Sequence, residues 1–245
     1  IIKVDSFINA IELICKILKE DFHGQLVEPN FESIFHEYFI KTQQRLREFQ
    51  SALKLNSDYI TINETKCINP IYLVNNLLKS ANTILNLKKM YFTIIHGDLN
   101  ITNIIYDSQN RSIKFLDPKG KYGEETFIFG DPSYDIMRIM ACVKYGYDTI
   151  ARGDYNVSVR PEGISVQVEM PNIYIKTHDE VVRILEENFP NIPSINYELQ
   201  SILYLLNLLP FHSDSMERSL VFYYWGTYHL NLWMNRQKEE NGIIY

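Results

Sequence analysis

Cysteine is scarce in this 245-residue chain, and its three copies, Cys15, Cys67 and Cys142, lie far apart. An odd number without paired spacing argues against a disulfide framework and against a thiolate zinc site, and it is typical of a reducing compartment. We therefore expect a cytoplasmic protein. Runs of Lys and Arg are also lacking and the formal charge is −6, so nucleic acid is not an expected partner.

No apolar stretch is long enough to cross a bilayer. The longest lies around residues 202–211 and is interrupted by Asn207, whereas a spanning helix needs about 20 apolar residues. The first 20 residues carry Asp5, Glu12 and Lys16 within their apolar pattern, which argues against a signal peptide. We expect no membrane partner. Hydrophobic residues make up 46% of the chain and charged residues 22%, the composition of an ordinary globular protein.

Apolar spacing predicts helices in the first part of the chain. Over residues 1–90, apolar side chains recur at three- and four-residue steps in three stripes, which is typical of amphipathic helices. The pair Asn69-Pro70 combines an N-cap residue with proline at the first helical position, so it predicts the start of the third helix. We interpret residues 1–90 as a helical part.

The pattern changes over residues 91–140 and again over 141–245. Short β-prone runs at 91–95, 103–106 and 112–116 predict strands, the last two forming a hairpin, and Asp131-Pro132 predicts a helix start. The remainder predicts a second hairpin at 156–170 and three helices, from the capping box at Thr177 to Pro190, over 195–209 and over 214–236. The expected fold class is α+β, mostly α, with short β-hairpins.

Residues 94–120 carry the pattern with the clearest chemistry. Asp98 and Asn103 stand five apart in a loop after a strand, and Asp117 ends the second strand of a hairpin. Phosphoryl transfer needs a carboxylate to accept the proton of the attacking hydroxyl and further oxygen ligands for Mg²⁺. The spacing His-x-Asp-x-x-x-x-Asn from His96 is that of a kinase catalytic loop. Oxygen ligands without a His/Cys cluster favour Mg²⁺ over zinc.

A family resemblance rests on these residues: His96-Gly97-Asp98-Leu99, Asn103-Ile104, Leu116-Asp117 and the stretch at 130–136. Together they resemble the aminoglycoside phosphotransferase and choline kinase family, which has a protein-kinase-like fold. The resemblance implies that Asp98 is the catalytic residue and that Asn103 and Asp117 bind the metal and, through it, ATP. It also implies that His96 and Asp135 support the loop. The helices on both sides agree in type and order with that family's C-terminal lobe.

Two features depart from the kinase pattern. Asp117 is followed by Pro118-Lys119-Gly120 rather than by the Phe-Gly of protein kinases, which makes protein kinases proper the more distant relatives. Before residue 90 there is no Gly-rich strand-turn-strand and no strand lysine of the kind that covers ATP in the family. The chain also begins with Ile1 rather than Met. We therefore expect residues 1–245 to form one kinase-like C-terminal lobe, with the ATP-covering lobe not in this chain.

The residues that would contact the acceptor of the phosphoryl group are predicted less clearly than those around Asp98. In the last helix Tyr224, Trp225 and Tyr228 lie on or near a common face, where they form either core or an aromatic wall for a cationic or sugar acceptor. His212 and Asp214, in the loop before that helix, are further candidate acceptor contacts. We expect a small-molecule hydroxyl acceptor, such as a sugar, an aminoglycoside or an amino alcohol. The sequence predicts neither the acceptor nor the oligomeric state.

Three functions remain open from the sequence. The leading interpretation is an ATP- and Mg²⁺-dependent kinase, a transferase acting on an alcohol group. The alternative is a non-catalytic, kinase-like interaction module that lacks the nucleotide lid. A third is a Mg²⁺-dependent phosphohydrolase using Asp98 and Asp117, although the Asp-x-Asp signature of the common aspartyl phosphatases is absent.

Overall fold

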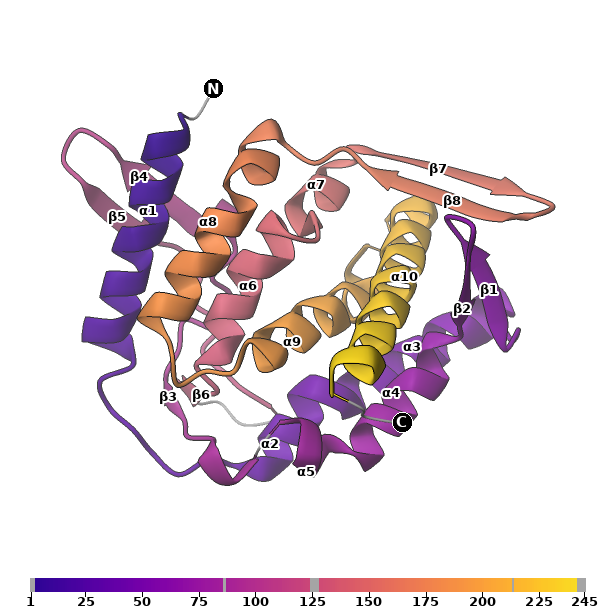
Figure 1. Cartoon of the computed structure of the whole chain (residues 1–245), viewed down its shortest axis with the longest axis horizontal. Coiled ribbons are helices and arrows are strands. Elements are labelled where there is room, and N and C mark those ends of the chain that lie inside the picture. The colour runs from indigo at the N-terminus through magenta and orange to yellow at the C-terminus, as the bar shows by residue number, and fades with distance from the viewer. Residues whose placement is uncertain (1–2, 86, 124–127, 213, 242–245) are drawn as a thin grey trace. The chain divides into compact units, whose positions relative to one another are not determined.

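The structure, a computed structural model, describes residues 3–85, 87–123, 128–212 and 214–241. This part of the chain is α+β and mostly helical, as expected, with one four-stranded and two two-stranded sheets (Figure 1). The chain divides into two compact units, each assembled from three separate segments. The first is Ile1–Ile34, Lys88–Asp148 and Met170–Glu198, and the second is Phe35–Leu87, Thr149–Glu169 and Leu199–Tyr245.

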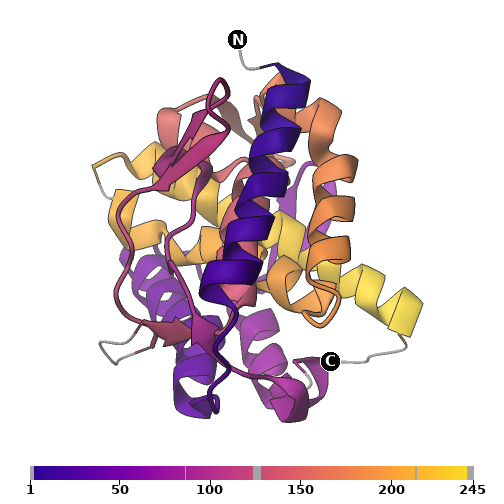
Figure 2. The ribbon, with the colours of Figure 1, turned by 90° about the vertical axis from the view of Figure 1, so that its left-hand side faces the viewer.

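Three helices form the frame of the first unit: α1 (Val4–Ile17), α6 (Ser133–Val143) and α8 (Asn172–Asn188). Helices α1 and α8 pack side by side (Figure 2), with the ring of Phe7 5.8 Å from that of Tyr174. The apolar stripe of α1 is buried as its spacing predicts, and the helix continues into a π-helical turn, Leu18–Phe22. Every residue of α6 is buried, so this helix is a rigid support for the segments bonded to it.

The strands of the first unit are short. β3 (Thr93–Ile94) pairs antiparallel with β6 (Phe129–Gly130), and β4 (Ile104–Asp107) forms a hairpin with β5 (Ser112–Phe115). Ile104 and Phe115 are partners at the open end of the hairpin. A 3₁₀ turn, Ile101–Asn103, leads into β4. The residues just before β4 and just after β5 therefore lie next to each other.

The second unit contains α3 (Lys41–Leu53), α4 (Pro70–Lys79), α5 (Ala81–Ile84) and α10 (Met216–Asn241), with a π-helical turn at His36–Ile40 and a 3₁₀ turn at Leu209–His212. Helix α10 packs against α4. The chain passes between the units within α2 (Phe31–Phe35), α7 (Tyr147–Arg152), α9 (Ser194–Asn207) and a 3₁₀ turn, Leu87–Lys89, and once more between Glu169 and Met170.

The sheet of the second unit joins two hairpins in the order β2-β1-β8-β7 (Figure 1). Its strands are β1 (Tyr59–Ile62), β2 (Thr65–Ile68), β7 (Tyr155–Arg160) and β8 (Gly163–Val168). β1 and β8 are parallel, and Asn63 joins them because its side chain accepts from the Val166 N–H (2.8 Å) and donates to the Val166 carbonyl (3.0 Å). Asn63 and Glu64 both have positive φ, the conformation of a tight hairpin turn.

Several local predictions are confirmed. The side chain of Asn69 accepts from the Ile71 N–H (3.1 Å) at the start of α4, and that of Asp131 accepts from the Ser133 N–H (2.9 Å) at the start of α6. The hairpin expected at 156–170 is β7–β8. The predicted start at Thr177 is wrong. α8 begins at Asn172, and the Thr177 hydroxyl donates to the Ile173 carbonyl (2.6 Å) inside the helix. The β1–β2 hairpin was not foreseen within the part expected to be helical.

Among the described helices, none is both long enough and apolar enough to cross a bilayer.

The cap of α4 provides a test of the second unit. Asn69 is 2% exposed, and besides the Ile71 N–H it accepts from Gln50 Nε2 (2.7 Å) and donates to the Ser57 carbonyl (2.9 Å). We expect Asn69→Ala to lower the free energy of unfolding by about 2–3 kcal/mol, since a cap is lost and buried polar groups are left unpaired. Chemical denaturation measures this. Asn82→Ala, at an exposed position of α5, should change the free energy of unfolding by less than about 0.5 kcal/mol. Equal losses in the two variants would contradict the assignment of Asn69 as the cap of α4.

Candidate active site

One buried carboxylate fixes the loop that carries Asp98. Asp135 lies in the first turn of α6 and is completely buried. Its two oxygens accept from different backbone groups, the N–H of His96 and the N–H of Gly97, both at 2.8 Å. Burial raises the pKa of Asp135 to about 6, while the two N–H donors and Arg138 oppose that rise. The carboxylate is therefore mostly ionised at neutral pH, with both oxygens available as acceptors.

A second set of backbone bonds ties the same loop to the turn that carries Asp117. The Leu116 N–H donates to the Asn103 carbonyl, and the Lys119 N–H donates to the His96 carbonyl, both at 2.9 Å. These bonds connect the two ends of the loop with the two sides of Asp117. Asp117 itself has φ 55°, a left-handed conformation that non-glycine residues rarely adopt. The sequence-predicted residues Asp98, Asn103 and Asp117 thus belong to two segments that are bonded to each other.

Gly97 allows this close approach. It has φ +77°, and a Cβ atom built on it would lie 2.9 Å from the Cβ of Lys119. A side chain at position 97 would therefore need both a strained backbone and a displaced turn. The glycine of the His-Gly-Asp sequence is explained by packing between the loop and the Asp117 turn.

The side chain of Asp98 is 34% exposed, and its carboxylate has three side-chain partners. Asn100 Nδ2 donates to Oδ1 (2.8 Å), and Asn103 Nδ2 donates to Oδ2 (3.1 Å) and to the Asp98 carbonyl (2.9 Å). Arg138 Nη1 lies 3.1 Å from Oδ1 in an ion pair, with its side chain only 6% exposed. Donors on both oxygens hold the carboxylate in one orientation while part of it remains open to solvent.

Arg138, Asn100, Tyr134 and Lys119 were not assigned to the site from the sequence. Arg138 Nη2 donates to the Tyr134 hydroxyl (3.2 Å) and to the Gly97 carbonyl (3.4 Å), and Lys119 Nζ donates to the same hydroxyl (3.2 Å). For Arg138 a signal existed: it follows Asp135 by three residues in an otherwise apolar helix, a spacing that places both side chains on one face.

His96 lies beneath the loop and is 3% exposed. Its Nδ1 accepts from the Asp98 N–H (3.3 Å), and its ring packs edge-on against Phe115 at 5.8 Å. Burial lowers the pKa of His96, so the imidazole is neutral at pH 7. These contacts are those of a residue that supports the loop, which is the role expected for it.

Asn103 and Asp117 offer the oxygen atoms that a hard cation prefers. Within the described part of the chain, neither Asn103 Oδ1 nor the Asp117 carboxylate accepts a hydrogen bond. The side-chain NH₂ of Asn103 donates to Asp98, so the Oδ1 of Asn103 is the atom that remains available to a ligand. The described residues include no group of three or more His, Cys, Asp or Glu gathered as a metal site. Two oxygen ligands suit Mg²⁺ that arrives with substrate phosphates.

The candidate acceptor contacts belong to the second unit. His212 stacks on Phe222 with ring centroids 4.8 Å apart, and burial lowers its pKa. Asp214 pairs with Arg218 at 3.1 Å. Tyr224 is buried, and Trp225 and Tyr228 are half-buried and stacked at 6.0 Å. The expected role of these five residues stays a prediction.

Comparisons of the chain with models of protein families, with curated proteins and with solved structures found no match.

The support of the loop by Asp135 can be tested through stability. In Asp135→Asn the amide keeps its shape but replaces one acceptor oxygen by a donor facing a backbone N–H. We expect the free energy of unfolding to fall by about 1–3 kcal/mol, with faster amide hydrogen exchange at His96 and Gly97. Chemical denaturation and exchange measured by NMR report the two effects.

Asp107→Asn is the matched control. Asp107 also accepts two backbone N–H groups, from Gln109 (2.9 Å) and Asn110 (3.2 Å), both on Oδ1, and its Oδ2 accepts from Asn110 Nδ2 (2.7 Å) in an exposed contact. Asparagine keeps the Oδ1 acceptor, and because the contact at Oδ2 is exposed, the Asn110 side chain can bond to water instead. The free energy of unfolding should therefore fall clearly less than in Asp135→Asn. Equal losses in the two variants would show that the buried bonds to Asp135 are not what holds the loop.

Proposed function

We propose that this chain is the catalytic lobe of a kinase that transfers a phosphoryl group from Mg²⁺-bound ATP to a hydroxyl of a small molecule. The observation that carries the proposal is the bonding of the Asp98 loop to the Asp117 turn, with Asp135 bonded beneath the loop. Phosphoryl transfer depends mainly on positioning and electrostatic stabilisation. The resemblance of these segments to the aminoglycoside phosphotransferase and choline kinase family supports the same reaction.

Asp98 is the proposed catalytic residue. Its carboxylate accepts the proton of the acceptor hydroxyl as the hydroxyl oxygen bonds to the γ-phosphorus, and ADP leaves as the bond to the β,γ-bridging oxygen breaks. Partial exposure gives the acceptor access to this carboxylate. Each carboxylate oxygen has more than one lone pair, so the bonds from Asn100 and Asn103 leave capacity for the substrate hydroxyl.

Asn103 and Asp117 are the proposed ligands of the metal–nucleotide complex. Magnesium bound there would supply positive charge against the phosphate oxygens. Asn103 is well suited because its N–H₂ group is fixed by Asp98, which leaves the carbonyl oxygen for the metal. Arg138 is proposed as a positioning residue, since it holds the Asp98 carboxylate and the Gly97 carbonyl at once.

One observation favours the alternative, a non-catalytic interaction module. The carboxylate of Asp98 is already bonded by Asn100, Asn103 and Arg138, and a carboxylate with this many donors is also what a purely structural loop requires. The two functions differ in what Asp98 does for turnover.

The decisive variant is Asp98→Asn in the full-length protein. The test follows transfer of the labelled γ-phosphate of ATP to a panel of sugars, aminoglycosides and amino alcohols. The amide takes the acceptor proton poorly, so we expect turnover to fall by about 10²–10⁴-fold. Its oxygen can still accept from Asn100 and Arg138, while its NH₂ group replaces the oxygen that accepts from Asn103. We therefore expect the fold and nucleotide binding to be retained with some loss of stability. Asp107→Asn, at the turn of the β4–β5 hairpin and outside the proposed site, should leave turnover unchanged.

Asp117→Asn should behave differently from Asp98→Asn. It removes charge from the proposed metal site, so both the affinity for Mg²⁺-ATP and turnover should fall. Calorimetric titration with ATP and Mg²⁺ separates the two variants. If Asp98→Asn keeps phosphorylation within a fewfold of wild type, Asp98 is not the base. If the wild-type protein transfers phosphate to none of the acceptors, the non-catalytic interaction module becomes the favoured function instead of the kinase.

A further inference from the structure

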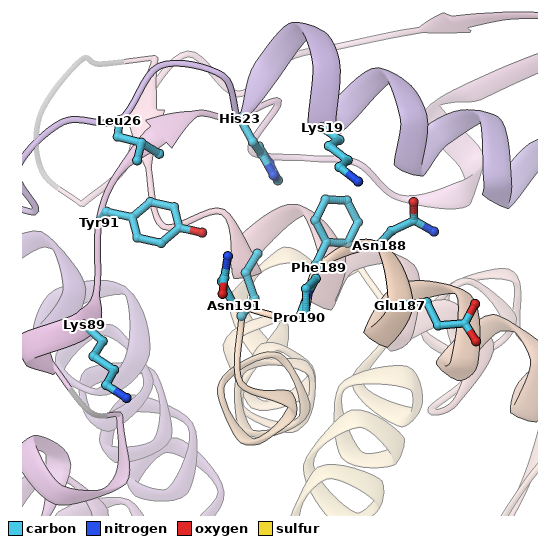
Figure 3. A pocket seen from close by; sticks show the side chains of 11 residues that line it. Lys19, His23, Leu26, Lys89, Tyr91, Glu187, Asn188, Phe189, Pro190 and Asn191 are labelled. Atoms are coloured by element: carbon cyan, nitrogen blue, oxygen red, sulfur yellow. The ribbon is translucent and has the colours of Figure 1, made fainter.

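The first unit contains a pocket of about 530 Å³ outside the candidate active site. It lies between the C-terminal end of the first helix, the segment before β3 and the connection from α8 to α9 (Figure 3). This volume is within the range of small-molecule sites and far above that of one water. The residues that line it are Lys19, His23, Leu26, Lys89, Tyr91, Glu187, Asn188, Phe189, Pro190, Asn191 and Ile192.

Neutral polar groups point toward the middle of this pocket. The ring of His23 and the hydroxyl of Tyr91 approach it from different segments, with Asn191 across from them (Figure 3). His23 Nε2 is buried and has no hydrogen-bond partner among the described residues. Buried polar atoms in proteins are almost always partnered, so this nitrogen is available to a polar group of a ligand in the pocket.

The protonation states of these two groups follow from burial. Burial lowers the pKa of His23 to about 4, so the imidazole is neutral at pH 7 and offers a hydrogen bond without a charge. Burial and the charge of Asp131 raise the pKa of Tyr91, so its phenol stays protonated and can donate. The middle of the pocket is therefore suited to a polar, uncharged part of a ligand.

The charge of the pocket is positive. Lys19 and Lys89 are both exposed, and neither forms an ion pair within the described part of the chain. Glu187, the one acid among the lining residues, is held by Arg183 through two bonds of 2.6 and 2.7 Å. Its charge is thus neutralised by a residue outside the lining, while the two ammonium groups remain available for an anion.

One wall of the pocket is flat and apolar. Phe189 is 7% exposed, and its ring lies 5.4 Å from the ring of His23. Pro190 and Ile192 add apolar surface to the lining of the pocket. Aromatic rings bind other flat rings by stacking or edge contacts, so the wall favours a planar ligand over a flexible chain.

We propose that this pocket binds a small aromatic anion. The ring of the ligand lies along Phe189, a hydroxyl or ring nitrogen meets His23 and Tyr91, and the anionic group pairs with Lys19. Lys89, at the rim, adds attraction at longer range. This site is separate from the proposed phosphoryl transfer and does not depend on it.

The test titrates the isotopically labelled chain with 6-hydroxy-2-naphthoate, followed by NMR of the His23 ring and the Tyr91 amide. The neutral comparison is 2-naphthol, which keeps the ring and hydroxyl but lacks the carboxylate. We expect saturable shifts at both residues and naphthoate binding at least about tenfold tighter than naphthol, because only the carboxylate can form a charge-assisted hydrogen bond with Lys19.

Lysine variants locate the anionic group. Lys19→Met should remove most of the tenfold preference for the carboxylate, and Lys89→Met should reduce it less. Lys176→Met, at an exposed position of α8 outside the pocket, should leave it unchanged. All three lysines are exposed, so the variants should fold.

Three results would overturn the proposal. The first is the absence of saturable shifts at His23 and Tyr91 up to the solubility of the probe. The second is equal affinity for naphthoate and naphthol, which would show apolar binding without anion recognition. The third is an equal loss of the preference for naphthoate over naphthol in Lys19→Met and Lys176→Met, which would show that the anion is attracted by the positive charge of the surface in general and not by this pocket.

Discussion

The candidate active site depends on one interaction, the pair of hydrogen bonds from the His96 and Gly97 N–H groups to the buried carboxylate of Asp135. Two adjacent N–H groups can point at one carboxylate only if the chain turns there, and Gly97 supplies the positive φ that this turn needs. Because Asp135 lies in the first turn of a helix that is buried along its length, the position of the loop is fixed by the position of α6. The orientation of Asp98, one residue further on, follows from that anchor.

The same helix also controls charge around Asp98. Arg138 stands three residues after Asp135, so one face of α6 carries both the carboxylate that fixes the loop backbone and the guanidinium that pairs with Asp98. Asp135 and Arg138 are neighbours on α6, and both bond to the loop that carries Asp98. This coupling explains how a buried acid and a nearly buried arginine are accommodated together: each is matched by charge and by hydrogen bonds. The net charge of −6 gives no indication of this local arrangement.

Local signals in the sequence predict the fold where a side chain bonds to its own backbone neighbours. The side chains of Asn69, the N-cap of α4, and Asp131, just before α6, each accept an N–H two residues ahead, which is a property of the local sequence. The helix start predicted at Thr177 is wrong because a capping-box pattern can also occur inside a longer helix, where the Thr177 hydroxyl bonds to the Ile173 carbonyl. The β1–β2 hairpin was missed because its Asn63-Glu64 turn lacks glycine, and Asn63 is held by Val166, a contact about a hundred residues away in sequence. Asp98, Asn103 and Asp117 could be proposed from spacing, whereas Arg138 and Asn100 needed the folded backbone.

The central claim is that Asn103 and Asp117 hold a metal–nucleotide complex beside Asp98. Paramagnetic line broadening by Mn²⁺ in the presence of ATP tests it most directly, since the effect detects weak binding and reports position. The account predicts the strongest broadening at the amides of residues 98–103 and of Leu116, Asp117 and Lys119, and its loss in Asp117→Asn. Broadening centred elsewhere, for example on the carboxylates of Glu180 and Glu187, and unaffected by Asp117→Asn, would contradict it.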